Sequence, residues 1–92
     1  MHDMKSEVIK NIELMGFKPY GKYGAYRAFI KDVEYVVIEH PLKGLSMTAT
    51  YISKRETGQI EIFLDRNSSM QDIAKSMLRL YNEFHPEKNN KI

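Results

Sequence analysis

The shortness of the connections between its strand-like segments is the feature of this sequence that most limits its fold. Four segments rich in β-branched and aromatic residues, 25–30, 33–39, 45–53 and 59–65, are separated by only two to five residues. Parallel neighbouring strands need a crossover of a dozen residues or more, so consecutive segments joined this closely pair as antiparallel neighbours. The sequence therefore predicts a four-stranded antiparallel meander.

Two helical patterns flank the strand region. In residues 3–15, apolar side chains recur at steps of three and four, and Asp3 is in position to cap the first turn. In residues 69–84, a wider apolar stripe follows Ser68 and Ser69, which both have the spacing of a capping residue. Packing both stripes against one face of the sheet predicts a two-layer α+β sandwich of the order α-β-β-β-β-α.

Residues 18–24, which join the first helix to the first strand, are predicted to be irregular. Pro19 lacks a backbone donor, and Gly21 and Gly24 weaken any regular element. The glycine-bearing stretch matches no nucleotide-binding fingerprint, and a strand follows it, so no helix N-terminus is available for a phosphate. We interpret it as a structural turn.

The chain length of 92 residues fits one domain with a modest core, which we assign to residues 1–86. Beyond Pro86, the polar residues 87–92 are predicted to form a flexible tail. The chain has no Cys, which excludes a disulfide framework and a Cys-type zinc site. The first residues lack the apolar core of a signal peptide, and no stretch reaches the ~20 apolar residues of a membrane span, so we expect a cytoplasmic protein.

The sheet face away from the helices is predicted to carry aromatic side chains. In the last strand Ile60, Ile62 and Leu64 alternate toward the core, which leaves Phe63 on the outer face. The three earlier strands carry apolar residues in both alternations, so their facing stays open. Protein interfaces concentrate aromatic side chains and arginine. The residues predicted to bind a protein partner are Tyr35, Tyr51 and Phe63 on the sheet and Arg55 at a loop rim.

Basic and aromatic residues gather in two windows that lack acidic residues. Residues 14–31 and 40–55 together hold seven of the fourteen Lys and Arg residues, although the formal net charge of the chain is only +2. Cations that neutralise phosphates, beside rings that stack on unpaired bases, favour binding of RNA or single-stranded DNA. The residues assigned to this alternative are Lys18, Tyr20, Lys22, Tyr23, Arg27 and Lys54.

Patterns typical of catalytic or metal sites are missing from the sequence. The three histidines, His2, His40 and His85, have no metal-ligand spacing, and no serine lies in a nucleophile motif. His40 would serve in acid–base chemistry only beside a carboxylate in a cleft. We therefore predict no catalytic residue, no metal and no cofactor.

These patterns together predict a small non-enzymatic interaction module. It would act as an inhibitor, regulator or adaptor, a group that includes phage-encoded inhibitors. It would bind a protein partner or a second copy of itself through the open face or an edge of the sheet. Nucleic-acid binding through residues 17–31 and the loop at 54–55 is the alternative, and neither hypothesis involves a membrane.

Overall fold

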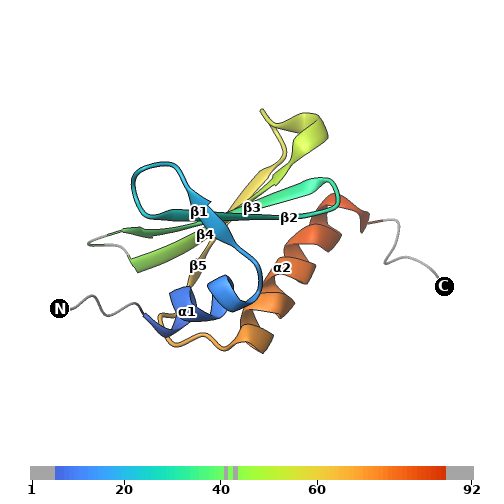
Figure 1. Cartoon of the computed structure of the whole chain (residues 1–92). Helices are drawn as coiled ribbons and strands as arrows, with labels where there is room; N and C mark the ends of the chain where they lie inside the picture. Colours follow the sequence, from blue (N-terminus) through green and yellow to red (C-terminus); the bar gives the residue numbers. More distant parts are fainter. Residues whose placement is uncertain (1–5, 41, 43, 87–92) are drawn as a thin grey trace.

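Five antiparallel strands and two α-helices make up the structure, a computed structural model that describes residues 6–40, 42 and 44–86. In chain order the elements are α1 (Glu7–Leu14), β1 (Lys18–Tyr20), β2 (Ala25–Ile30), β3 (Val33–His40), β4 (Gly44–Tyr51), the 3-10 helix η1 (Ile52–Lys54), β5 (Gln59–Leu64) and α2 (Met70–Phe84). Both α-helices lie under the same side of the sheet (Figure 1). The predicted α+β class is confirmed. The predicted cap at Asp3 and the predicted tail at 87–92 lie outside the described residues.

The prediction of four strands is wrong by one strand, because Lys18–Tyr20 forms β1 at the edge of the sheet. Its three residues pair with the first half of β2, with Pro19 opposite Tyr26. A proline fits an edge strand, since its missing N–H can face the side where no further strand needs a donor. Gly21 and Gly24, with φ of 79° and 78°, turn the chain from β1 into β2. The sheet order is β1-β2-β3-β4-β5, a simple meander.

The core lies between the sheet and the two helices, and it decides which alternation of each strand faces inward. Tyr35 of β3 is fully buried, and its hydroxyl donates a hydrogen bond to the Met77 carbonyl of α2 at 2.8 Å. Ile60, Ile62 and Leu64 of β5 pack against this core from its margin, as predicted. The buried apolar residues of the central strands and the helices include Val33, Val37, Leu45, Met47 and Ala49 from β3 and β4, Val8 and Ile12 from α1, and Ile73, Met77 and Leu80 from α2.

Polar contacts fix the beginning of each helix. The Ser69 hydroxyl accepts a hydrogen bond from the backbone N–H of Asp72 at 3.1 Å, which confirms one of the two predicted caps of α2. The Asn11 side chain of α1 donates to the Ser68 carbonyl at 2.9 Å, and the N–H of Val8 donates to the Arg66 carbonyl. The start of α1 is thereby tied to the segment that leads into α2, so the helical layer forms one unit beneath the sheet.

Candidate functional site

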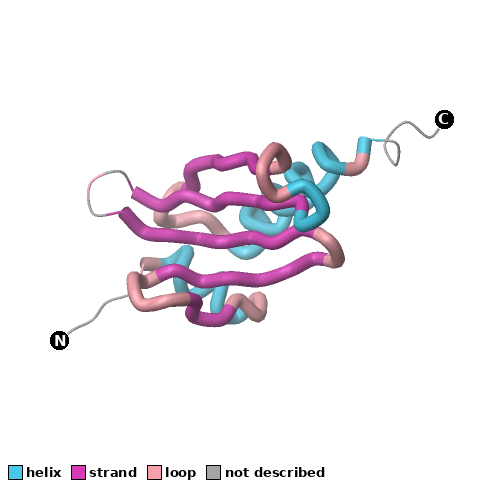
Figure 2. Tube along the Cα trace, turned by 90° about the horizontal axis from the view of Figure 1, so that it is seen from above, coloured by secondary structure: helices cyan, strands magenta, loops and turns pink. Residues whose placement is uncertain are grey.

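Neither α-helix covers the face of the sheet opposite α1 and α2, here called the outer face (Figure 2). Two loops rise above it at its borders, residues 21–24 between β1 and β2 and residues 52–58 between β4 and β5 (Figure 1). The strand register assigns to this face the larger side chains of Lys18, Tyr20, Arg27, Phe29, Glu34, Val36, Ile38, Thr48, Glu61 and Phe63.

A buried carboxylate lies among the residues of the outer face. Glu34 of β3 is only 6% exposed, and two arginines form ion pairs with it: Arg27 Nη1 lies 3.4 Å from Oε2, and Arg55 Nη1 lies 3.2 Å from Oε1. A carboxylate withdrawn from water needs such partners, because its desolvation is otherwise costly. Arg55 comes from the loop at 52–58, so the contact holds that loop against the sheet. We name Arg27, Glu34 and Arg55 the arginine cluster.

Exposed aromatic rings adjoin the arginine cluster. The guanidinium carbon of Arg27 lies 4.2 Å from the ring centroid of Tyr20 and 5.2 Å from that of Phe29, within the range of cation–π contacts. Tyr20 is 43% exposed, Phe29 50% and Phe63, on the opposite border of the sheet, 62%. The outer face therefore presents large rings on both sides of a charged centre whose geometry is already set by ion pairs.

The structure divides the residues predicted to bind a protein partner. Phe63 and Arg55 lie on the outer face, as the hypothesis requires. Tyr35 does not, because its ring fills the core and its hydroxyl already has a helix carbonyl as partner. Tyr51 does not either: it faces the helices and stacks on Phe84 of α2 with the ring centroids 5.5 Å apart. These two placements correct the predicted partner set, and Tyr20 and Phe29 take their place.

The residues assigned to nucleic-acid binding lie in three places. Lys18, Tyr20 and Arg27 are neighbours on β1 and β2. Lys22 and the exposed Tyr23 belong to the loop at 21–24, whereas Lys54 ends η1 in the loop on the opposite border. The structure thus brings together only the first three, and in that group the Arg27 guanidinium is already engaged with Glu34 and Tyr20.

The two described histidines have structural partners. His40 Nε2 lies 3.2 Å from Ser46 Oγ, but Ser46 is only 2% exposed, so its hydroxyl is closed to a substrate. His85 Nε2 lies 3.1 Å from Asp32 Oδ1, and the His85 ring packs 4.5 Å from the Tyr81 ring, which joins the end of α2 to the β2–β3 turn. Across the described ranges, no group of three or more His, Cys, Asp or Glu residues is placed to hold a metal ion.

Comparison of the chain with protein-family models, with curated proteins and with solved structures finds no match. None of the helices in the described part of the chain has both the length and the apolar character needed to cross a membrane.

The buried Glu34 was not foreseen from the sequence. Its carboxylate is held by Arg27, seven positions earlier, and by Arg55, twenty-one positions later. In the sequence Glu34 alternates with Val33 and Tyr35 as any solvent-facing residue of a half-buried strand does. The only available signal was the presence of two arginines on elements that the predicted meander places next to the strand of Glu34.

Proposed function

We propose that this protein is a non-enzymatic interaction module whose outer face binds an acidic surface of a partner protein. The observation that carries the proposal is the arginine cluster, held by ion pairs and adjoined by the exposed rings of Tyr20 and Phe29, with the exposed ring of Phe63 at the far border of the same face. Arginine and aromatic side chains supply most of the energy at protein interfaces, and arginines already held in place lose little freedom on binding.

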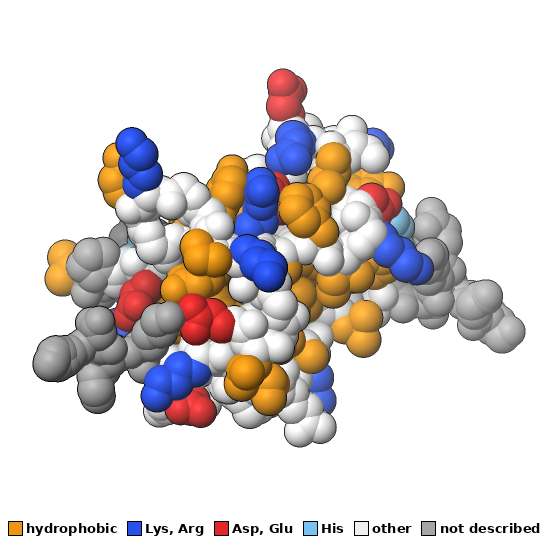
Figure 3. Space-filling view, in the orientation of Figure 1, with side chains coloured by type: hydrophobic (Ala, Val, Ile, Leu, Met, Phe, Trp, Pro, Cys, Tyr) orange, Lys and Arg blue, Asp and Glu red, His pale blue; other side chains and the backbone are white. Residues whose placement is uncertain are grey.

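The charge of the outer face supports an acidic partner. The half of the face near β1 and β2 holds Lys18, Lys22 and Arg27, and the loop at the opposite border holds Lys54 and Arg55. Glu34, Glu61 and the exposed Glu56 of the loop at 52–58 offset three of these five positive charges. Lys and Arg side chains are visible over both raised loops and between them, beside exposed apolar side chains (Figure 3). Complementary charge of this kind speeds encounter and selects the partner.

A protein fits the outer face better than a nucleic acid does. The Tyr20 ring is covered on one side by Arg27, so it is less available to stack on a base. The six residues assigned to nucleic-acid binding lie in three separate places, so they form no continuous basic track for a phosphate backbone. A second copy of the chain is also disfavoured at this face, because two equally positive surfaces would meet.

Affinity capture from the native host tests this function. The bait proteins are the wild type, the outer-face double variant Arg55→Glu/Phe63→Ser, and Glu83→Arg, a control on an exposed position of α2. We expect wild type and control to retain the same nuclease-resistant protein, and the double variant to retain less by about tenfold. Sedimentation of the free protein reports its mass against 10.8 kDa for one chain.

Three results would overturn the proposal. The first is captured material that nuclease releases, which supports nucleic-acid binding. The second is equal capture by the wild type and the double variant, when thermal melts show that both are folded. The third is a stable dimer of the free protein that the double variant dissociates, which assigns the outer face to self-association.

A further inference from the structure

A second surface lies at the border of the sheet, where part of β2 has no neighbouring strand. β1 pairs only with Ala25–Arg27, so residues 28–30 of β2, here called the free edge, have no strand beside them in the part of the chain that the structure describes. Residues that flank a two-residue hairpin turn bond to each other, and the pattern then alternates along the strand. Ile30 and Ala28 therefore bond toward β3, and the backbone N–H and C=O of Phe29 point outward.

An apolar hollow of about 360 Å³ opens directly beside the free edge. Met15 and Phe17 border it from the end of α1, Ile30 borders it from β2, and Ala74, Met77 and Leu78 border it from α2. Leu78 is 58% exposed, so the apolar lining continues to the surface of α2. The volume is at the small end of the ~300–1,000 Å³ range of ligand sites, which suits one large side chain. The site thus combines outward backbone groups with an apolar pocket.

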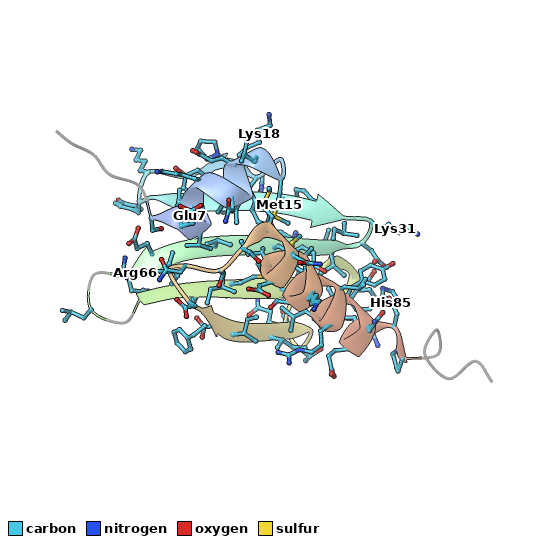
Figure 4. The ribbon with its side chains drawn as sticks, turned by 90° about the horizontal axis from the view of Figure 1, so that it is seen from below. Glu7, Met15, Lys18, Lys31, Arg66 and His85 are labelled. Carbon is cyan, nitrogen blue, oxygen red and sulfur yellow. The ribbon has the colours of Figure 1, made fainter. Side chains whose placement is uncertain are left out.

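Positive charges surround this hollow. A neighbouring hollow of about 390 Å³ continues along the same border and is bordered by Lys18 and Arg27. Lys31 lies in the turn at the other end of the free edge, and Met15 lies along this border with Lys18 and Lys31 (Figure 4). On α2, Lys75 follows directly after Ala74. The nearest acidic residue in sequence to Lys31 is Asp32, whose Oδ1 lies 3.1 Å from His85 Nε2 of the segment that ends α2.

We propose that the free edge binds an extended, acidic peptide segment of a partner protein, with one large apolar side chain inserted into the hollow. The peptide backbone would add to β2 through the outward N–H and C=O of Phe29, as in other cases of strand addition. Carboxylates on either side of the apolar residue would meet Lys18 at one end and Lys31 at the other. This site is distinct from the outer face, although the two share the strand β2 and the residues Lys18, Arg27 and Phe29, and it does not depend on the function proposed above.

Selection from a displayed library of random heptapeptides identifies the preferred ligand chemistry. We expect enrichment of peptides with a single Leu, Ile, Met or Phe between Asp and Glu residues. An enriched peptide, labelled with fluorescein, is then titrated with each variant and its fluorescence anisotropy is recorded. Ala74→Arg fills the hollow while adding a positive charge, so we expect it to weaken binding by about tenfold or more. We expect Lys18→Glu/Lys31→Glu to weaken binding by a similar factor.

Two controls keep the result specific. Glu83→Arg also adds positive charge to α2, but on an exposed position outside the hollow, so we expect it to leave binding unchanged. The outer-face double variant Arg55→Glu/Phe63→Ser should bind the peptide within about twofold of wild type, which separates this site from the proposed function. Enrichment of basic, proline-rich or no peptides would overturn the proposal, as would unchanged binding by a folded Ala74→Arg variant.

Discussion

Tyr35→Ala is expected to lower the free energy of unfolding by about 3–5 kcal/mol, the range seen when a large aromatic core residue is truncated. Tyr35 is fully buried between the sheet and α2, and its hydroxyl donates to the Met77 carbonyl at 2.8 Å. Small domains have a total free energy of unfolding of about 5–15 kcal/mol, so the substitution is expected to remove a large fraction of it. Urea unfolding followed by circular dichroism measures the change.

Tyr35→Phe is the matched control for that prediction. It keeps the ring and removes only the hydroxyl, so we expect a loss of about 1 kcal/mol. The Met77 carbonyl lies in the interior of α2 and can also accept a bond within the helix, which keeps the loss small. A loss below about 1 kcal/mol in Tyr35→Ala would contradict the burial of this ring and would support its predicted place on the outer face.

The stability of the wild type is expected to fall by about 2 kcal/mol between pH 10 and pH 12 through Tyr35 alone. Burial, followed by the charges of Tyr81 and Asp32, raises the pKa of Tyr35 from 10.0 to about 12. The unfolded chain releases the phenolic proton of Tyr35 near pH 10, whereas the folded chain keeps this proton until about pH 12. The folded state therefore keeps its full stability below pH 10 and loses this contribution as the pH rises through that interval.

The difference between wild type and Tyr35→Phe isolates this effect from the titration of the other tyrosines and the lysines. At pH 8 we expect Tyr35→Phe to be the less stable protein by about 1 kcal/mol. Near pH 12 the order should reverse. At this pH the folded wild type must either keep the Tyr35 phenol protonated or bury a phenolate, whereas Tyr35→Phe carries neither cost. Urea midpoints measured at intervals from pH 8 to pH 12 give the two curves. Parallel curves over the whole range would contradict the raised pKa.

The α+β class of the fold follows from local patterns. The apolar stripe of α2, the cap at Ser69 and the alternation of β5 each depend on residues close together in the sequence, and each is found as predicted. The strand β1 could not be predicted in this way, because Pro19 opposes a regular element unless an edge position removes the need for its donor. Its pairing with β2 exists only once the sheet has formed.

The candidate site was less accessible to sequence reasoning than the fold. The placement of Phe63 on the outer face was predicted correctly because its neighbours on β5 alternate cleanly between apolar and polar. Tyr35 and Tyr51 were misassigned because both alternations of β3 and β4 contain apolar residues, and the choice depends on which of them α2 covers. A tyrosine in the sequence does not indicate an exposed position, because its hydroxyl can form a hydrogen bond inside the core, as Tyr35 does with a helix carbonyl.

Site-specific photo-cross-linking tests most directly whether the outer face is the binding surface. A photoreactive phenylalanine analogue is placed at Phe63 or at Tyr20, which lie on opposite borders of that face, and at Glu83 on α2 as the control. Each variant is expressed in the native host and irradiated. We expect positions 63 and 20 to form the same protease-sensitive, nuclease-resistant adduct, and position 83 to form none. Adducts at position 83 alone, or adducts at 63 and 20 that nuclease destroys, would contradict a protein-binding outer face.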